Sequence, residues 1–485
     1  MARFAVGFGN RSFFPPKYMA QAREELPAVL KELGHEAIMM GADATDLGAV
    51  QTREEGRRWA AWLEHQRYDG IIWTHPNFGD ESGMLPALMG AGKRGDKILI
   101  HGYPDQMDQL GWNDRRDSFC GIMSTMDVLH QYGIDFVKLA PHVVIPQSDE
   151  FAENISLFDK ICRGQADDPY VPVAPEEPGD CTNALEGITL LALGARTTPF
   201  FTTRYDELAA AKNWITIETT DLSEVFSRMD DIDAESDAYR QRANELGEYT
   251  SWEKATAESF DKQVRLSLTM DSFLEEYQPV AVGVRCWTEF QKIKKISPCT
   301  SISYLNNRGT PTACEVDLGN ALTMYVMKRC GADIVACQDW NNNFGEEDDK
   351  FMFMHCGPHD TRWLKPGHYV ETHGILDHDF GEGTGMGCLQ GRFEPTPVTI
   401  GSATIVGEGV RFYFTEGDVT EDVVPPEYFG SAGVCRIPKL QKTILQIGHG
   451  GYKHHFSMAR GHVADEAIDM LRQNPRYEVT DLRKV

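Results

Sequence analysis

Short apolar segments alternate with longer amphipathic segments through the first 160 residues of the chain. Each apolar segment is followed by a stretch with apolar positions at helical spacing, which is typical of strands that alternate with helices. The expected strands cover residues 3–8, 36–40, 71–73 and 97–101, and the expected helices cover residues 16–33, 52–66 and 82–91. This alternation predicts an α/β unit with a doubly wound parallel sheet.

Two changes of pattern divide the rest of the chain. Residues 163–180 carry four prolines and several acidic residues without periodicity, and they predict an interdomain linker. A second α/β stretch follows, and after residue 357 short β-rich segments separated by glycines predict a mostly antiparallel sheet or small barrel. We therefore expect three domains, at residues 1–170, 171–356 and 357–485.

The composition is that of a globular protein with a strongly acidic surface. The 485 residues include 73 Asp and Glu against 47 Lys and Arg, which is a formal net charge of −26. The electrostatic field of this negative net charge repels phosphate backbones and anionic lipids, so neither nucleic acid nor a membrane is an expected partner. The apolar runs are too short for a membrane span or a signal peptide, and the 11 cysteines include no Cys-x-x-Cys pair. We therefore expect a cytoplasmic protein with reduced thiols.

Two carboxylates flank a segment with the pattern of strand, helix and strand. Glu315 ends the first strand, the helix covers residues 318–330, and Asp339 follows the second strand, which begins at residue 333. If these strands are parallel neighbours, both carboxylates lie at the ligand-binding edge of one sheet, and His355 reaches the same edge from the next strand. This set suits a divalent cation such as Mn²⁺ or Mg²⁺. The alternative is that both carboxylates only cap the elements that follow them.

Histidines are concentrated toward the end of the chain, where nine of the 15 come after residue 350. His454 and His455 are consecutive, and because consecutive strand residues point to opposite faces, only one of them is expected to join a given site. Four more are expected to be structural or exposed to solvent: His359, His368, His373 and His378.

The chain resembles the L-fucose isomerase/L-arabinose isomerase superfamily of metal-dependent aldose–ketose isomerases. The resemblance is specific from about residue 285 onward and rests on Cys286-Trp287-Thr288, residues 313–324, Asp339-Trp340, and His455 seven residues before His462. It implies that Glu315, Asp339 and His455 hold a divalent cation, either Mn²⁺ or another ion such as Mg²⁺ or Co²⁺. The arabinose branch adds a histidine ligand that the fucose branch lacks, and this ligand falls on His355.

The superfamily fold consists of two Rossmann-like doubly wound domains and a C-terminal β-rich, barrel-like domain, in agreement with the pattern above. In the family, the first domain of a neighbouring subunit contributes to the pocket, which implies a homo-oligomer, a trimer or hexamer, with shared sites. By weaker local similarity, substrate contacts fall on Arg11 and Trp73, and His355 and Lys453 complete the candidate set. Residues 281–284 lack the glutamine that the fucose enzymes place there, so their sugar preference does not carry over.

Together these features predict an aldose–ketose isomerase. Glu315 and Asp339 would move a proton between C1 and C2 of an open-chain sugar through a cis-enediol. No redox cofactor is needed, and Gly7-Phe8-Gly9 alone is weak evidence for a dinucleotide. The expected substrate is a pentose, a deoxyhexose or a substituted hexose such as a sulfonated one. A metal-dependent epimerase or aldolase and a non-catalytic sugar-binding protein are the alternatives.

Overall fold

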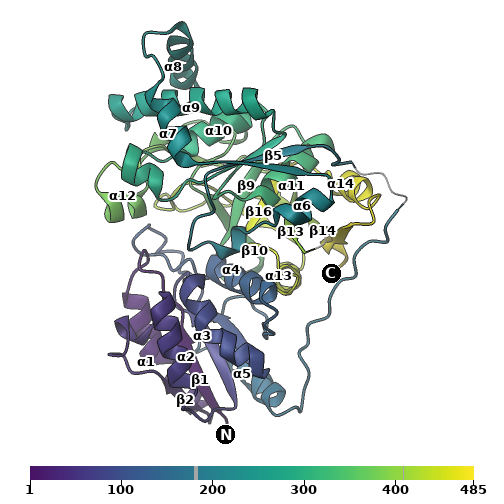
Figure 1. The fold of residues 1–485 in the computed structure, drawn as a ribbon. Coiled ribbons are helices and arrows are strands. Elements are labelled where there is room, and N and C mark those ends of the chain that lie inside the picture. Colours follow the sequence, from purple (N-terminus) through teal and green to yellow (C-terminus); the bar gives the residue numbers. More distant parts are fainter. Residues whose placement is uncertain (180–183, 408) are drawn as a thin grey trace.

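The N-terminal unit is a parallel four-stranded sheet with strand order β2-β1-β3-β4, flanked by helices (Figure 1). The structure is a computed structural model that describes residues 1–179, 184–407 and 409–485. The elements of this unit are β1 (Arg3–Phe8), α1 (Lys17–Glu32), β2 (Glu36–Met39), η1 (Asp46–Gly48), α2 (Arg53–Leu63), β3 (Gly70–His75), α3 (Glu81–Arg94), β4 (Ile98–Gly102), α4 (Ser118–Gln131) and α5 (Asp149–Cys162). The predicted doubly wound α/β unit is confirmed.

Local sequence accounts for these elements. The buried residues of α1 recur every three or four positions and form one apolar face: Tyr18, Met19, Ala22, Leu26 and Leu30. Helix α2 begins with a capping box, in which the side chains of Thr52 and Glu55 each accept a backbone N–H of the other residue. The helices of this unit are therefore specified by spacing and capping that are visible in the sequence.

The central unit is a second parallel four-stranded sheet, with strand order β6-β5-β7-β8. Its strands are β5 (Thr189–Leu193), β6 (Thr216–Thr220), β7 (Ala281–Val284) and β8 (Thr312–Cys314). Its helices are η2 (Phe201–Thr203), α6 (Glu207–Lys212), α7 (Leu222–Asp230), α8 (Asp237–Tyr249), α9 (Ala257–Tyr277), η3 (Phe290–Lys294), α10 (Cys299–Asn307) and α11 (Leu318–Arg329). Helices α8 and α9 lie at the end of the molecule farthest from the N-terminal unit (Figure 1).

The last unit is a nine-stranded sheet with strand order β11-β12-β15-β10-β9-β16-β13-β14-β17. An additional pairing of β14 with β15 closes six antiparallel strands into a barrel, which confirms the predicted β-rich, barrel-like unit. Its strands are β9 (Val335–Phe344), β10 (Glu347–His355), β11 (Tyr369–Glu371), β12 (Cys388–Arg392), β13 (Thr396–Val406), β14 (Gly409–Val419), β15 (Ser431–Arg436), β16 (His455–Arg460) and β17 (Tyr477–Asp481). Its helices are η4 (Thr361–Trp363), α12 (Gly374–Phe380), α13 (Leu440–His449), α14 (Ala464–Leu471) and η5 (Leu482–Lys484).

One predicted connection is wrong. Strand β8 pairs with β7 in the central sheet, whereas β9 pairs with β10 and β16 in the barrel, so this segment is not a βαβ unit within one sheet. Helix α11 instead bridges the two sheets, because it packs on β7 and β8 and also on β13 and β16. Asp339 accordingly lies within β9 and not at its end. A buried apolar strand has the same sequence pattern in a parallel and an antiparallel sheet, so the pattern could not distinguish them.

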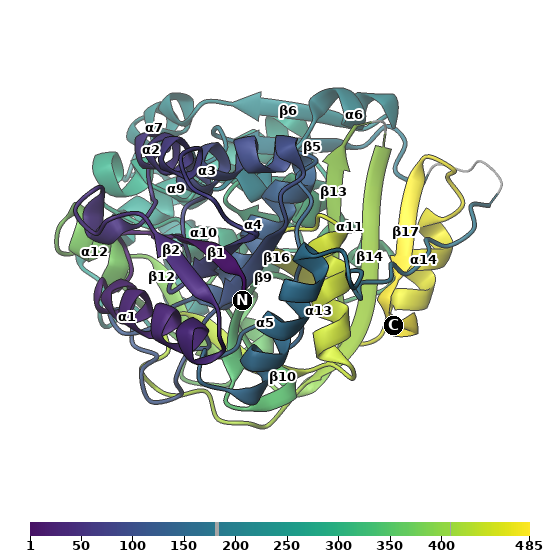
Figure 2. The same ribbon diagram turned by 90° about the horizontal axis from the view of Figure 1, so that it is seen from below.

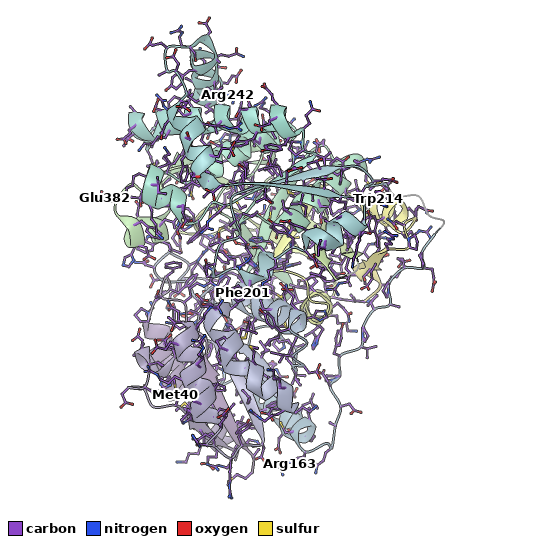
Figure 3. All side chains as sticks on the ribbon, viewed as in Figure 1. Met40, Arg163, Phe201, Trp214, Arg242 and Glu382 are labelled. Carbon is purple, nitrogen blue, oxygen red and sulfur yellow. The ribbon has the colours of Figure 1, made fainter. Side chains whose placement is uncertain are left out.

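Helix α4 connects the N-terminal unit to the barrel. It is buried over nearly its whole length and packs against β4 on one side and against β9 and α13 on the other. Figure 2 shows α4 near the centre of the molecule, between the N-terminal strands and the barrel. The same junction contains Phe201, whose backbone N–H donates to Glu81 at 3.3 Å (Figure 3).

Residues 167–179, within the predicted linker, contain no helix or strand and run along the outside of the molecule (Figure 1). The N–H of Glu176 donates to the carbonyl of Val479 at 2.7 Å, so the linker is bound to the barrel. Asp180, the last residue of the predicted linker, lies outside the described residues. Among the described helices, none combines the length and the apolar character that crossing a membrane requires.

Candidate active site and metal centre

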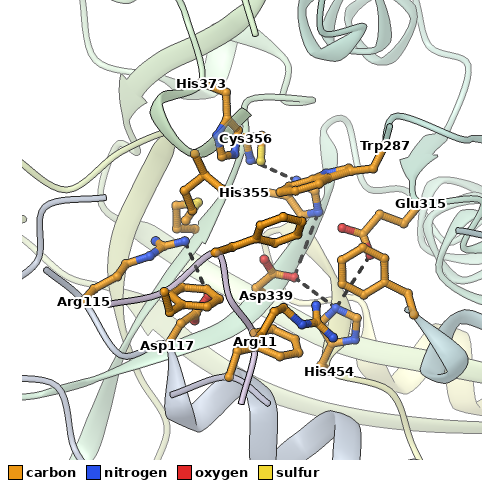
Figure 4. A pocket seen from close by; sticks show the side chains of 16 residues that line it. Arg11, Arg115, Asp117, Trp287, Glu315, Asp339, His355, Cys356, His373 and His454 are labelled. Atoms are coloured by element: carbon orange, nitrogen blue, oxygen red, sulfur yellow. Dashed lines mark hydrogen bonds and ion pairs between the residues drawn. The ribbon is translucent and has the colours of Figure 1, made fainter. Parts of the chain in front are cut away.

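Two of the predicted metal ligands, Glu315 and Asp339, line a pocket to which all three units contribute (Figure 4). The N-terminal unit supplies Arg11, Phe78, Arg115 and Asp117. The rest of the chain supplies, among others, Phe200, Trp287, Glu315, Asp339, His355, Cys356, His373 and His454. A single chain therefore brings residues more than 300 positions apart to one cavity.

Glu315, Asp339 and His455 face one another at this pocket. The Nε2 atom of His455 lies 3.4 Å from Glu315 Oε2 and 3.2 Å from Asp339 Oδ1. His455 and Asp339 are direct partners across the antiparallel pair of β16 and β9, so their side chains share one face of the barrel. Glu315 reaches them from the turn between β8 and α11, where its φ is 58°. The three residues are thus brought together by the contact between two sheets.

Four buried polar atoms at this point have no hydrogen-bond partner among the described residues: Glu315 Oε2, Asp339 Oδ1, His355 Nε2 and His455 Nε2. Leaving one buried polar group unpaired costs about 1–3 kcal/mol, so a cluster of four is unfavourable without an occupant. Ligand atoms of Glu315, His454 and His455, and those of Asp339, His355 and His455, lie within 4.8 Å of one another. Carboxylate oxygens and imidazole nitrogens are ligands of Mn²⁺, Mg²⁺ and Co²⁺, so these residues fit a divalent cation.

Hydrogen bonds on the second ring nitrogen distinguish His455 from His355. The Nδ1 atom of His455 lies 2.9 Å from the Asp317 carboxylate, which can only accept, so Nδ1 carries the proton and Nε2 keeps its lone pair. In His355, Nδ1 accepts the backbone N–H of Cys356 at 2.9 Å. Burial lowers the pKa of His355 well below its usual value, so the ring is neutral and its proton lies on Nε2. His455 is therefore suited to metal binding and His355 to donating a hydrogen bond.

Asp317 and Lys453 hold His455 in place. Lys453 Nζ donates to Asp317 Oδ1 at 2.5 Å, and both side chains are buried. Burial by itself raises the pKa of Asp317, but the Lys453 ammonium and His455 together keep it below its usual range. The absence of a side chain at Gly319 makes room for this pair, because a Cβ there would lie 2.5 Å from Lys453 Nζ. Lys453 lies behind the centre and is not among the residues that line the pocket, so its predicted substrate contact stays a prediction.

We expect Asp317→Asn to weaken the affinity for Mn²⁺ by about 10–100-fold, the usual effect of removing a group that orients a metal-binding histidine. The variant keeps the side-chain shape but leaves Lys453 without its carboxylate. Competition between the protein and a metal chelator measures the affinity. Asp481→Asn is the control, because Asp481 is also buried and bound to an arginine but belongs to β17. An unchanged affinity in folded Asp317→Asn would contradict the role assigned to this carboxylate.

Both central carboxyl groups are shifted toward their protonated form. Burial raises the pKa of Asp339 to about 7, although His455 opposes this shift. The pKa of Glu315 is raised well above its usual value, first by burial and then by Cys286 and Asp339. A divalent cation bound between these groups would favour their ionised forms and oppose both shifts.

Two histidines differ from the expectation. His454 also faces the centre, with Nε2 3.8 Å from Glu315 Oε2 and 4.0 Å from Asp339 Oδ1. Because β16 begins at His455, His454 precedes the strand and the alternation of faces does not apply to it. His373, expected to be structural or exposed, is buried and lines the pocket.

Arg11 lies at the pocket of its own chain. Its guanidinium is 4.1 Å from the centre of the Phe78 ring, and its Nε donates to the carbonyl of Gly79 at 2.8 Å. Helix α4 holds the N-terminal unit against the barrel of its own chain, and the site shared between subunits that the family resemblance implies stays a prediction. Arg11 needs no neighbouring subunit to reach this pocket, and assembly into a trimer or hexamer stays a prediction.

Trp73 is not among the residues that line the pocket, and its substrate contact stays a prediction without support from this geometry. It is fully buried within β3 and makes an edge-to-face contact with Trp59, with ring centres 5.5 Å apart. The loop after β3 does reach the pocket, through Phe78, and the loop after β4 reaches it through Arg115. Arg115 was not predicted from the sequence, although loops at the carboxyl ends of parallel strands are where such sheets bind ligands.

Comparison with known domain families matches two parts of the chain. Residues 5–166 match the family described as "Fucose/sulfoquinovose isomerase, N-terminal domain", and residues 354–480 match "L-fucose isomerase, C-terminal domain". The fold and the site define a class of proteins with two parallel α/β units, an antiparallel barrel and a carboxylate–imidazole centre between them. Since the two matches together span more than half of the sequence, the chain belongs to the L-fucose isomerase superfamily.

The curated relatives are distant. The chain is 22% identical to a sulfoquinovose isomerase of Priestia aryabhattai over 44% of this chain and 47% of that protein. It is 22% identical to one of Alkalicoccus urumqiensis over 53% of this chain and 56% of that protein, and 24% identical to one of Clostridium sp. (strain MSTE9) over 62% and 70%. The chain thus spans about half the length of the first two of these relatives.

Proposed function

We propose that the protein is a metal-dependent aldose–ketose sugar isomerase. The observation that carries this proposal is the cluster of unpartnered buried atoms of Glu315, Asp339, His355 and His455 beside the pocket. Such a cluster offers both ligands for a cation and groups that transfer protons. The relatives named sulfoquinovose isomerase support the same class of reaction.

Glu315, Asp339 and His455 would hold the cation, for which Mn²⁺ is our first candidate and Mg²⁺ or Co²⁺ the alternatives. When bound, the ion supplies a Lewis acid that polarises the sugar carbonyl. One of the two carboxylates takes the proton from C2 and returns it to C1, and the other moves the proton between the hydroxyl oxygens. The reaction therefore passes through a cis-enediol and needs no redox cofactor.

The walls of the pocket support this chemistry in two ways. His355 carries its proton on Nε2, 4.0 Å from Asp339 Oδ1, and is placed to donate a hydrogen bond to a sugar oxygen beside that carboxylate. Phe78, Phe200 and Trp287 form apolar walls. Such walls exclude water from an enediol and strengthen the electrostatic interactions around it.

We propose further that the substrate carries an anionic group, as sulfonated hexoses do. Arg115 is 95% buried at the pocket. Its Nη2 lies 3.4 Å from Asp117 Oδ2, whereas its Nε and Nη1 donors have no partner in the part of the chain that the structure describes. Guanidinium donors bind sulfonate and carboxylate oxygens through charge-assisted hydrogen bonds. Figure 4 shows Arg115 and Glu315 on opposite sides of the pocket, so a sugar could present one end to each.

A sugar panel in D₂O tests the proposed reaction. The protein with Mn²⁺ is incubated with sulfoquinovose, L-fucose or D-arabinose, and the products are identified by NMR. Formation of a ketose with deuterium at C1 is the expected result, because a carboxylate that carries the proton exchanges it with solvent. An epimerised aldose would indicate an epimerase, cleavage of a carbon–carbon bond an aldolase, and binding without conversion a sugar-binding protein.

Arg115→Gln tests the proposed anionic substrate. We expect kcat/KM for the sulfonated sugar to fall by about 10–100-fold, the value of one or two charge-assisted hydrogen bonds, while kcat/KM for a neutral sugar changes much less. Steady-state kinetics on both sugars measure the difference. Arg204→Gln is the control, because Arg204 is a cation that does not line this pocket. Equal losses on both sugars would contradict the proposed anion contact.

A further inference from the structure

Five cysteines form a cluster directly behind one wall of the pocket. They come from five separate segments, after β7, at the start of α10, at the end of β8, after β10 and at the start of β12: Cys286, Cys299, Cys314, Cys356 and Cys388. The thiol of Cys299 lies against those of Cys314, Cys356 and Cys388, and its sulfur is 3.8 Å from that of Cys388. We call this set the thiol cluster.

The arrangement of the thiol cluster does not suit a metal ion. A structural thiolate site places four ligands around an empty centre. Here the sulfur of Cys299 itself occupies the middle, and among the described residues no three cysteine sulfurs lie within 4.8 Å of one another. The geometry therefore favours a bond between two sulfurs, with Cys299 as one of them.

Access from the pocket selects the second sulfur. Cys356 lines the pocket and is only half-buried, whereas the other four members of the cluster are at least 97% buried. A small oxidant that enters the pocket therefore meets Cys356 first. Cys356 also follows His355 in the chain, and its backbone N–H is the donor that fixes the tautomer of His355.

We propose that Cys356 and Cys299 form an oxidation site at which a peroxide converts two thiols into a disulfide. The Cys356 sulfur attacks hydrogen peroxide and breaks the O–O bond, which gives a sulfenic acid and one molecule of water. The Cys299 sulfur then attacks the sulfenic sulfur and displaces the second water. Two thiols are oxidised and one peroxide is reduced to two waters.

The disulfide would change the pocket. A disulfide requires the two sulfurs to come to about 2.05 Å from each other, which draws the Cys356 side chain toward Cys299 and away from the pocket. This movement shifts the backbone N–H that His355 accepts. Because small displacements of a positioned group cost large factors in rate, we expect the oxidised protein to lose about 10- to 100-fold in activity.

Oxidation is expected to be slow. Contact with Cys299 and burial raise the pKa of the Cys356 thiol well above its usual range, so little thiolate is present at neutral pH. The two cysteines therefore react with peroxide more slowly than a peroxide sensor does, and they become oxidised only during sustained exposure to peroxide. A reducing agent such as dithiothreitol restores both thiols, which makes the change reversible.

Peptide mass spectrometry tests the proposal without reference to activity. The full-length protein with Mn²⁺ is treated with hydrogen peroxide, alkylated and digested without reduction. We expect a linked pair of peptides that contain Cys299 and Cys356 and that separate after dithiothreitol. A link from Cys299 to Cys388 or Cys314, or no link at all, would overturn the proposal even if isomerase activity were never found.

Activity provides the second measurement, and it rests on the proposed isomerase function. The wild-type protein should lose activity in peroxide and regain it in dithiothreitol, whereas Cys299→Ser should keep its activity in peroxide. Cys435→Ser is the matched control, because Cys435 is a fully buried cysteine of β15 outside the thiol cluster, and it should respond like the wild type. Equal loss in Cys299→Ser and the wild type would contradict the proposed effect on the pocket.

Discussion

Asp339→Asn is expected to lower kcat by about 10²–10⁴-fold, the usual contribution of a positioned acid–base group. Asparagine has nearly the same shape but cannot carry a proton between carbon atoms, and it is a weaker ligand for a cation. Asp339 Oδ1 has no hydrogen-bond partner within residues 1–179, 184–407 and 409–485, so the substitution breaks no hydrogen bond of that atom there. The loss should therefore appear in turnover and metal binding and not in folding. Ketose formation at saturating Mn²⁺ gives kcat, and thermal unfolding gives stability.

The control for this prediction lies on the neighbouring strand. Asp349 of β10 forms an exposed ion pair with Arg436 at 2.7 Å, and Asp349→Asn should leave kcat nearly unchanged, because exposed pairs contribute little. Glu315→Gln should resemble Asp339→Asn. Near-native turnover in Asp339→Asn or Glu315→Gln would show that the two carboxylates are structural.

Removal of divalent cations is expected to abolish turnover and to lower the melting temperature. Without a cation, the Glu315 and Asp339 carboxyl groups and the His455 Nε2 atom face one another, and among the described residues these atoms have no hydrogen-bond partner. A cation that binds only the folded state at 100 times its Kd stabilises it by about 2.7 kcal/mol, so the melting temperature should rise as Mn²⁺ is added back. Calorimetry of the chelated protein with and without Mn²⁺ measures this without an activity assay.

A pair of histidine variants locates the cation. His455→Gln should lose bound Mn²⁺, because Asp317 holds the lone pair of His455 Nε2 toward the centre. His355→Gln is the matched control. His355 is as deeply buried as His455 and lies beside it at the centre, but its Nε2 carries a proton and cannot bind a cation. We expect the His355→Gln variant to retain Mn²⁺ and to show a higher KM. Measurement of the Mn²⁺ content after gel filtration distinguishes the two variants. Full activity in protein shown to contain no metal would refute the metal centre.

Spacing in the sequence was sufficient for the elements of the α/β units, whereas the main members of the centre followed from the motifs that the chain shares with the isomerase superfamily. Helices such as α1 follow from apolar residues at helical spacing, and such local preferences act within a few residues. Glu315, Asp339 and His455 were also selected from the sequence, by residue type and by the motifs around them. Their roles stay predictions until the variants are measured, but the structure brings them together.

The way in which these residues meet was decided by the tertiary structure alone. The same apolar run can form a parallel or an antiparallel strand, so only the folded chain shows that Asp339 belongs to the barrel and Glu315 to the central sheet. Trp73 had the right residue type for a sugar contact but lies inside β3, where its ring packs on Trp59.

Sequence by itself therefore determined the classes of element, because these depend on local spacing and residue type, and its motifs singled out Glu315, Asp339 and His455 as candidates. Only the tertiary structure decided that Lys453 supports Asp317, that His454 joins the centre and that Arg115 presents unpaired donors to the pocket. Each of these depends on contacts between segments far apart in the chain. Such contacts are set by how whole sheets pack and leave no periodic signal in the sequence.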